Sequence, residues 1–287
     1  MRHRGLDFWA LTKPRLNMLV LFTTWGGIYL AKPEGVPLPT LLHTLMGTAL
    51  VAGGAAALNQ VWERDTDKKM RRTRLRPLPD GRLAVGESTW FGLLMSAAGL
   101  TQLALGVNLA SAGVAALTLL SYVVIYTPLK TRTSLATLIG AVPGALPPVI
   151  GWAAATGEVP LPAWVLFGIV FLWQMPHFLA IAWMYRDDYA SAGIPLLPVL
   201  EPDGRRTGTQ AFLYAVALWP MSLLPAIVGL GGVAYVMVAT CLGLAFIALA
   251  ALFARERSMV TARRLFLFSL AYLALLWATL VIDRVAI

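Results

Sequence analysis

Asn59, Glu63 and Asp67 stand four residues apart in the sequence. On a helix this spacing stacks side chains on one face, so an amide oxygen and two carboxylates would enter one small volume. Mg²⁺ suits such a set, because it takes one or two carboxylates and leaves other positions to water and phosphate oxygens. The spacing therefore predicts a Mg²⁺ site. The alternative is a solvated helix end whose acids pair with nearby arginines.

A strongly basic segment follows this acidic cluster, and it consists of Lys68, Lys69, Arg71, Arg72, Arg74 and Arg76. Arginine forks match phosphate oxygens in a bidentate way, so we favour Arg72 and Arg76 as ligands of a diphosphate. Lys130 and Arg132, further along the chain, are candidates for the same role. The alternative is that these residues only hold a loop on the cytoplasmic side of a membrane.

A second acidic pair, Asp187 and Asp188, follows a long apolar stretch that contains His177. We expect Asp188 to be a further metal ligand, and the alternative is a hydrated loop pair. Ionisable residues inside membrane spans mark function by default, and a neutral imidazole can ligate iron. The alternative for His177 is a structural hydrogen bond to a neighbouring helix.

The composition indicates that these residues sit on membrane helices. The chain is 58% hydrophobic and 13% charged, whereas a soluble domain carries about 25% charged residues. Seven stretches hold no Asp, Glu, Lys or Arg: 16–31, 35–62, 88–129, 133–157, 159–185, 207–254 and 265–282. A spanning helix needs about 20 apolar residues, and two of the stretches are long enough for two helices separated by glycines.

The expected fold is therefore an all-α, polytopic membrane bundle of nine transmembrane helices in one domain covering residues 1–287. The helices are predicted at about 16–31, 38–60, 88–107, 112–129, 135–155, 162–184, 209–229, 233–253 and 264–282. The N-terminal apolar stretch lacks a small-residue cleavage site, so we interpret it as the first of these helices.

The distribution of basic residues predicts the orientation of the bundle. With nine spans, all lysines and arginines except Lys32 and Arg284 fall on one side. The positive-inside rule makes that side cytoplasmic, with the N-terminus inside, the C-terminus outside and functional loops at about 62–87 and 184–207. The net charge of +9 is thus mainly a topology signal, and we expect no nucleic-acid partner.

Several of these segments together resemble a known family. Asn59 to Asp67, followed by Arg72-Thr73 and Arg76-Pro-Leu-Pro79, is similar to the first acidic motif of the UbiA superfamily of membrane prenyltransferases. Further matching segments run from residue 11 to residue 195 and point to its haem-prenylating branch: 11–15, 126–130, 144–154, 176–178 and 188–195. Gln60 stands where many members carry a second Asp.

The resemblance implies an activity and its partners. The donor would be farnesyl diphosphate, the acceptor a vinyl group of haem B, and the product haem O for terminal oxidases. Mg²⁺ would be the cofactor, held by a catalytic set of Asn59, Glu63, Asp67 and Asp188. Substrate would be bound by Arg72, Arg76, Tyr126, Lys130, Arg132 and His177. The protein would lie in the bilayer of the bacterial inner membrane, with haem A synthase or oxidase assembly proteins as partners.

Three other functions compete with this interpretation. One is a prenyltransferase for a quinone precursor, against which the segments around His177 and Asp188 argue. Another is a transporter, but transporters place polar coupling residues near the bilayer midplane, and here every acid lies outside the charge-free stretches. A structural assembly factor would not need the array of Asn59, Glu63 and Asp67.

Overall fold

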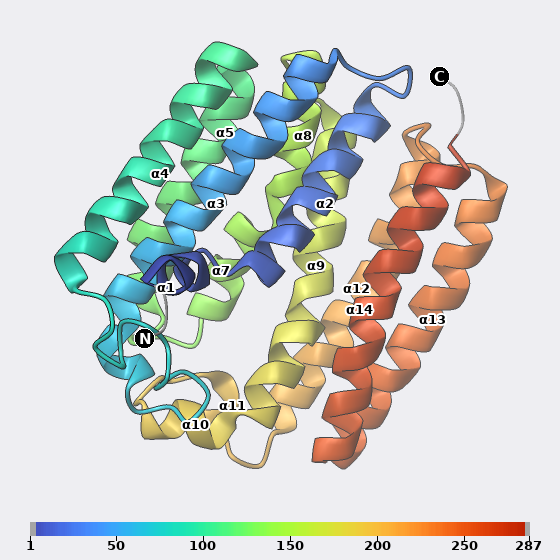
Figure 1. The fold of residues 1–287 in the computed structure, drawn as a ribbon. Coiled ribbons are helices and arrows are strands. Elements are labelled where there is room, and N and C mark those ends of the chain that lie inside the picture. Colours follow the sequence, from blue (N-terminus) through green and yellow to red (C-terminus); the bar gives the residue numbers. More distant parts are fainter. Residues whose placement is uncertain (1–3, 285–287) are drawn as a thin grey trace. The chain divides into compact units, whose positions relative to one another are not determined.

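The computed structural model describes residues 4–284, which form helices and connecting turns with no strand (Figure 1). The contacts divide them into two compact units. The first unit comprises residues 4–159 and 190–194, and the second comprises residues 160–189 and 195–284. The all-helical fold is confirmed, and the single domain over 1–287 stays a prediction.

The first unit holds the helices that carry the first acidic cluster. They are α1 (Arg4–Leu11), α2 (Pro14–Ala31), α3 (Leu38–Asp67), α4 (Val85–Gly106), α5 (Leu109–Leu120), the π-helix η1 (Ser121–Tyr126), α6 (Thr127–Leu129), α7 (Ala136–Ala145) and α8 (Pro147–Thr156). The long helices pack in a ring in which α2 contacts α3, α3 contacts α4, α4 contacts α5, α5 contacts α8 and α8 contacts α2.

Glycines let two pairs of helices in this ring approach closely. A Cβ on Gly99 of α4 would lie 2.6 Å from the carbonyl oxygen of Gly47 on α3. A Cβ on Gly151 of α8 would lie 1.9 Å from the carbonyl oxygen of Thr24 on α2, and one on Gly27 would lie 2.1 Å from the carbonyl oxygen of Pro148. Small residues at such crossings are typical of membrane bundles, where close van der Waals packing drives association.

The second unit is a four-helix bundle. Its elements are α9 (Leu161–Met184), α10 (Arg186–Ser191), α11 (Leu197–Leu200), α12 (Arg205–Ile227), α13 (Val233–Glu256) and α14 (Met259–Ile282); the last residues of α10 belong to the first unit. In the bundle α9 contacts α12, α12 contacts α13, α13 contacts α14 and α14 contacts α9. Ser258 caps the start of α14 by accepting the backbone N–H of Thr261 at 3.1 Å.

Seven helical segments of the described chain are long and apolar enough to cross a membrane. They include α3, the segment 109–129, the segment 136–156 and the four long helices of the second unit. Helices α2 and α4 overlap the other two predicted spans, but they are not among the seven. A multi-pass membrane protein is therefore confirmed, and the count of nine spans stays a prediction.

Candidate active site

The end of α3 carries the predicted acidic cluster. Asn59, Glu63 and Asp67 all lie on this one helix, and their side chains are buried, with Asp67 fully so. Their burial confirms the shared face expected from the spacing of four residues. They are preceded on α3 by a run of small residues, all of them buried: Gly53, Gly54 and Ala55 to Ala57.

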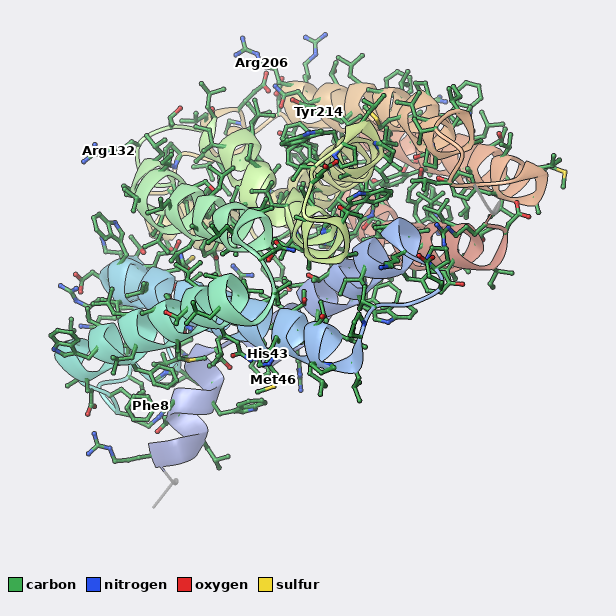
Figure 2. All side chains as sticks on the ribbon, turned by 90° about the horizontal axis from the view of Figure 1, so that it is seen from above. Phe8, His43, Met46, Arg132, Arg206 and Tyr214 are labelled. Atoms are coloured by element: carbon green, nitrogen blue, oxygen red, sulfur yellow. The ribbon has the colours of Figure 1, made fainter. Side chains whose placement is uncertain are left out.

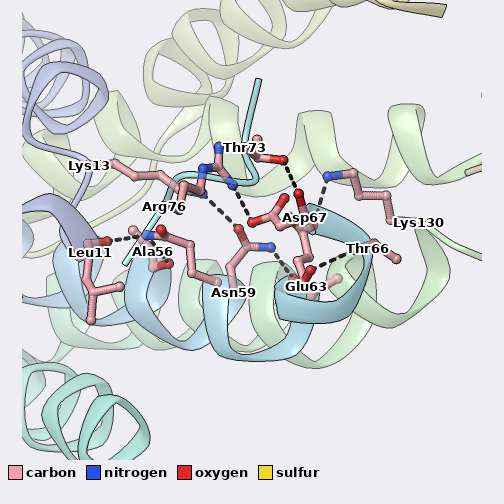
Figure 3. A network of polar contacts seen from close by, with 12 residues as sticks. Leu11, Lys13, Ala56, Asn59, Glu63, Thr66, Asp67, Thr73, Arg76 and Lys130 are labelled. Carbon is pink, nitrogen blue, oxygen red and sulfur yellow. Dashed lines mark hydrogen bonds and ion pairs between the residues drawn. The ribbon is translucent and has the colours of Figure 1, made fainter. Parts of the chain in front are cut away.

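Three cations from three other segments meet this face (Figure 3). The ammonium of Lys130 donates to Oε1 of Glu63 at 2.8 Å, and the guanidinium of Arg76 donates to Oδ2 of Asp67 at 2.7 Å. The ammonium of Lys13 donates to Oδ1 of Asn59 at 2.8 Å. Two carboxylates and three cations therefore leave the cluster with one net positive charge, which favours an anionic ligand.

Lys13 was not expected in the site. It precedes Pro14 at the start of α2 with φ +48° and ψ +58°, the left-handed region that costs a non-glycine residue about 1–3 kcal/mol. Burial lowers the pKa of Lys13 to about 8, against the opposing effect of the Glu63 carboxylate. The surrounding structure therefore holds a strained and poorly solvated cation at Asn59. The segment 11–15 was the only signal for it in the sequence.

A π-helical turn places the residues after α5. The backbone N–H of Thr127 bonds to the carbonyl of Tyr122 five residues earlier, and its hydroxyl donates to the same oxygen at 2.8 Å. That hydroxyl accepts the Asn59 amide N–H at 3.1 Å. Such bulges are frequent at functional sites. The π-turn therefore helps to bring Thr127 and Lys130 against α3. The sequence predicted an uninterrupted helix over 112–129 and gave no sign of this turn.

The loop after α3 supplies Arg76. The hydroxyl of Thr73 donates to the backbone carbonyl of Asp67 at 2.9 Å, and the segment continues in successive turns. Ser191, the last residue of α10, belongs to the first unit, and its hydroxyl donates to the backbone carbonyl of Lys69 at 3.1 Å. These bonds fold the basic loop back over the end of α3.

The other predicted residues of the first unit are less enclosed. Arg72 is exposed, and so is Arg132, which points away from the ribbon in Figure 2. Tyr126 lies in η1 and stacks on Tyr122, with ring centroids 5.4 Å apart. Asp65 is exposed and lies near the cations of Arg64 and Lys68, away from the buried face. Among the predicted basic residues, Arg76 and Lys130 both contact the acidic cluster.

The second unit carries the remaining predicted residues. Asp187 is exposed, whereas Asp188 is half-buried. His177 is buried in α9 and bonds through Nδ1 to the hydroxyl of Ser269 on α14 at 2.7 Å. These residues and those on α3 belong to different units, so a shared role of Asp188 with α3 stays a prediction.

The cluster on α3 fits a hard divalent cation. Oδ1 of Asp67 is buried and has no hydrogen-bond partner, and such an orphaned carboxylate oxygen costs free energy unless a cation or donor reaches it. Within residues 4–284, no group of three or more His, Cys, Asp or Glu side chains is close enough to hold a metal alone. Two carboxylates and an amide are nevertheless sufficient for Mg²⁺ that also binds substrate phosphates.

The sequence is similar to known proteins over nearly its full length. A sequence model of the UbiA prenyltransferase family matches residues 19–277. A protoheme IX farnesyltransferase of Solibacter usitatus is 49% identical and covers 97% of this chain and 98% of its own length. One from Myxococcus xanthus is 48% identical, with coverage of 97% and 95%.

Solved structures are similar in fold at much lower identity. A digeranylgeranylglyceryl phosphate synthase superposes with a TM-score of 0.82 at 17% identity, over 96% of this chain and 97% of that one. A UbiA homologue from Aeropyrum pernix K1 has a TM-score of 0.72 at 20% identity, with coverage of 93% and 97%. One from Archaeoglobus fulgidus bound to GPP and Mg²⁺ has a TM-score of 0.65 at 15% identity, with coverage of 96% and 99%.

Proposed function

Because the chain belongs to the UbiA prenyltransferase family, we propose that it transfers the farnesyl group of farnesyl diphosphate to a vinyl group of haem B, giving haem O. The observation that carries this proposal is the full-length match to protoheme IX farnesyltransferases at 49% and 48% identity. It favours haem over a quinone precursor as the acceptor, and a prenyltransferase over a transporter.

The reaction moves charge in a way that suits the cluster on α3. The allylic C–O bond of the donor breaks, its electron pair stays on the diphosphate, and the farnesyl carbon becomes cationic. The vinyl π-electrons form the new C–C bond, and water adds to the resulting cation with loss of a proton. Groups that stabilise the diphosphate as its charge develops lower the barrier.

The chain's own cations perform this stabilisation in our proposal. Lys13, Arg76 and Lys130 converge on one face, and their N–H groups donate to diphosphate oxygens when the donor binds. Because all three are held by Asn59, Asp67 and Glu63, they need little reorganisation during the reaction. The apolar helices around them keep water from the farnesyl cation.

Mg²⁺ would be held by Asn59, Glu63 and Asp67, where it would neutralise the diphosphate as a Lewis acid. The orphaned Oδ1 of Asp67 supports this assignment. The structure of the Archaeoglobus fulgidus homologue, described as bound to GPP and Mg²⁺, supports it by analogy. We also propose Asp188 as a metal ligand, and Arg72, Arg132, Tyr126 and His177 as residues that bind substrate.

Purified protein in detergent tests the proposed acceptor. With farnesyl diphosphate and Mg²⁺, we expect haem B to be converted to a haem that elutes later in reversed-phase chromatography. A parallel reaction with 4-hydroxybenzoate is expected to give no product. Unmodified haem B together with prenylated 4-hydroxybenzoate would replace haem by a quinone precursor as the acceptor.

Arg76 should matter more than its neighbour Arg74 for donor binding. Arg76 bonds to buried Asp67, whereas Arg74 is exposed. A hydrogen bond to a charged group is worth about 1.5–3 kcal/mol, so Arg76→Ala should raise the KM for farnesyl diphosphate by roughly 10-fold to 100-fold. Arg74→Ala is the matched control and should stay close to wild type. Equal effects of the two variants would show that only the net charge of the loop counts.

We propose a location in the bacterial inner membrane, with the N-terminus cytoplasmic and the C-terminus outside. The support is the placement of the basic residues, of which only Lys32 and Arg284 fall on the outer side under nine spans. Reporter fusions after Asp80 and after Asp203 should both read as cytoplasmic. A periplasmic signal at either position would overturn this topology. Haem A synthase or oxidase assembly proteins remain our proposal for partners.

A further inference from the structure

An imidazole is held rigidly inside the second unit. The ring of His177 on α9 packs against the rings of Trp173 and Phe266, with centroid distances of 5.1 Å and 4.9 Å. Trp173 lies one turn before His177 on α9, and its indole N–H donates to the backbone carbonyl of Ser269 at 2.6 Å. The ring therefore has little freedom to rotate, and both its nitrogens point in set directions.

The hydrogen bonds determine which nitrogen carries the proton. The hydroxyl of Ser269 lies 2.6 Å from the backbone carbonyl of Phe266, and since a carbonyl can only accept, the hydroxyl donates there. The same hydroxyl oxygen lies 2.7 Å from Nδ1 of His177. With its own proton directed to Phe266, this hydroxyl accepts the proton of Nδ1–H. In the neutral imidazole Nε2 then has no proton and presents its lone pair.

The lone pair on Nε2 has no partner within residues 4–284, since the only hydrogen bond of His177 is the one through Nδ1. The side chain is nine-tenths buried, at 9% exposure. Nε2 itself is not among the fully buried polar atoms without a partner in the described residues, so its lone pair is open to a ligand. A histidine that donates through one nitrogen and offers the other in an apolar surrounding has the arrangement of a metal ligand. In such sites the hydrogen bond to the first nitrogen fixes the tautomer and the ring orientation.

From this arrangement we propose that Nε2 of His177 ligates the iron of the haem acceptor, and that Ser269 is the positioning residue that keeps this nitrogen unprotonated. The inference rests on haem being the acceptor, as proposed above. Imidazole is a common axial ligand of haem iron. His177 precedes the end of α9 at Met184 by seven residues, which is about 10 Å along the helix axis. As an iron ligand, His177 would thus hold the porphyrin within the apolar part of the second unit. It would not itself activate the vinyl carbon.

Titration of the purified full-length protein with two porphyrins tests the proposal. The probes are ferric haem B and iron-free protoporphyrin IX, and binding is followed by absorbance and by fluorescence quenching. His177→Gly should lose haem affinity by at least about tenfold and change the Soret band, whereas its affinity for iron-free protoporphyrin should stay close to wild type. Added imidazole should restore the wild-type Soret band of this variant. Ser269→Ala should weaken haem binding roughly 10-fold to 100-fold, as loss of an outer-shell partner does.

A merely structural role for His177 makes a different pattern. It would weaken the binding of both porphyrins equally and would not respond to imidazole, and this result would overturn the proposal. An unchanged Soret band in His177→Gly would also overturn it, while conversion of haem B by the wild type would leave the proposed function standing. If the wild type neither binds nor converts haem B, then haem B is not the acceptor. The proposal that His177 ligates its iron would then also be wrong.

Discussion

The variant Asp67→Asn is expected to lose about two to three orders of magnitude in kcat, the effect of removing one preorganised charge-stabilising group. Asp67 is fully buried, it pairs with Arg76 through Oδ2, and its Oδ1 has no partner. Asparagine keeps the shape of the side chain but removes the charge that Mg²⁺ and Arg76 require. The rate of farnesyl transfer at saturating substrates, followed over a titration of Mg²⁺, measures the effect.

Asp65→Asn is the matched control for this variant. Asp65 is only two residues away, but its side chain is 67% exposed and points off the buried face. It should therefore keep most of the wild-type rate. Full activity of Asp67→Asn at limiting Mg²⁺ would contradict the role of the α3 cluster, provided that both variants purify as folded protein.

Replacement of Gly151 by alanine should destabilise the first unit by about 3 kcal/mol, the upper part of the range typical of overpacking. The added Cβ would lie 1.9 Å from the backbone carbonyl oxygen of Thr24, and a backbone atom cannot move aside as the end of a flexible side chain can. Helices α2 and α8 would have to separate, and α2 begins directly after Lys13. Thermal unfolding in detergent, followed by circular dichroism, should therefore show a lower Tm.

Gly113→Ala is the control for the intrinsic effect of glycine replacement. A Cβ at Gly113, within α5, meets no atom within 4 Å. Alanine is favoured over glycine in a helix by about 0.5–1 kcal/mol, so this variant should be as stable as wild type or slightly more so. A Tm for Gly151→Ala that equals that of Gly113→Ala would show that the crossing of α2 and α8 is not tight.

The positions of the helices could be predicted because charge and turn residues mark their ends. The break between α7 and α8 falls at Leu146, directly before Pro147 and Pro148, as expected of residues that cannot donate to the preceding turn. The π-turn of η1 has no such marker. Its Thr127 bonds to Tyr122 and to Asn59 on α3, contacts that no sequence pattern announces. The sequence therefore predicted a helix of ordinary period over this stretch.

The site was predictable where its residues share one helix and unpredictable where they come from several segments. Glu63 and Asp67 follow from the period of α3. By contrast, Lys13 meets Asn59 from 46 positions away in sequence, and Lys130 meets Glu63 from 67 positions away. The sequence left two alternatives, a metal site or an ion-paired helix end. The structure shows that the ion pairs exist and that the cluster is buried, not solvated. Gln60, in place of an acid, donates to the carbonyl of Leu11 at 2.7 Å and so braces the segment before Lys13.

Ser269 illustrates a second limit. It lies 92 positions after its partner His177, in a part of the chain that resembled the family only in hydrophobicity. A single serine in an apolar stretch gives no sequence signal of its partner. Its contact with the imidazole of His177 is therefore seen only in the packing of α9 against α14.

The most direct test of the central claim is mass spectrometry of haem extracted from cells that make this protein, compared with cells that make Asp67→Asn in equal amount. Wild-type cells should contain a haem heavier than haem B by one farnesyl group and one hydroxyl group. Cells with the Asp67→Asn variant should contain haem B with little or none of that product. Equal amounts of the product in both would contradict the catalytic role of the α3 cluster, and its absence from wild-type cells would contradict farnesyl transfer to haem.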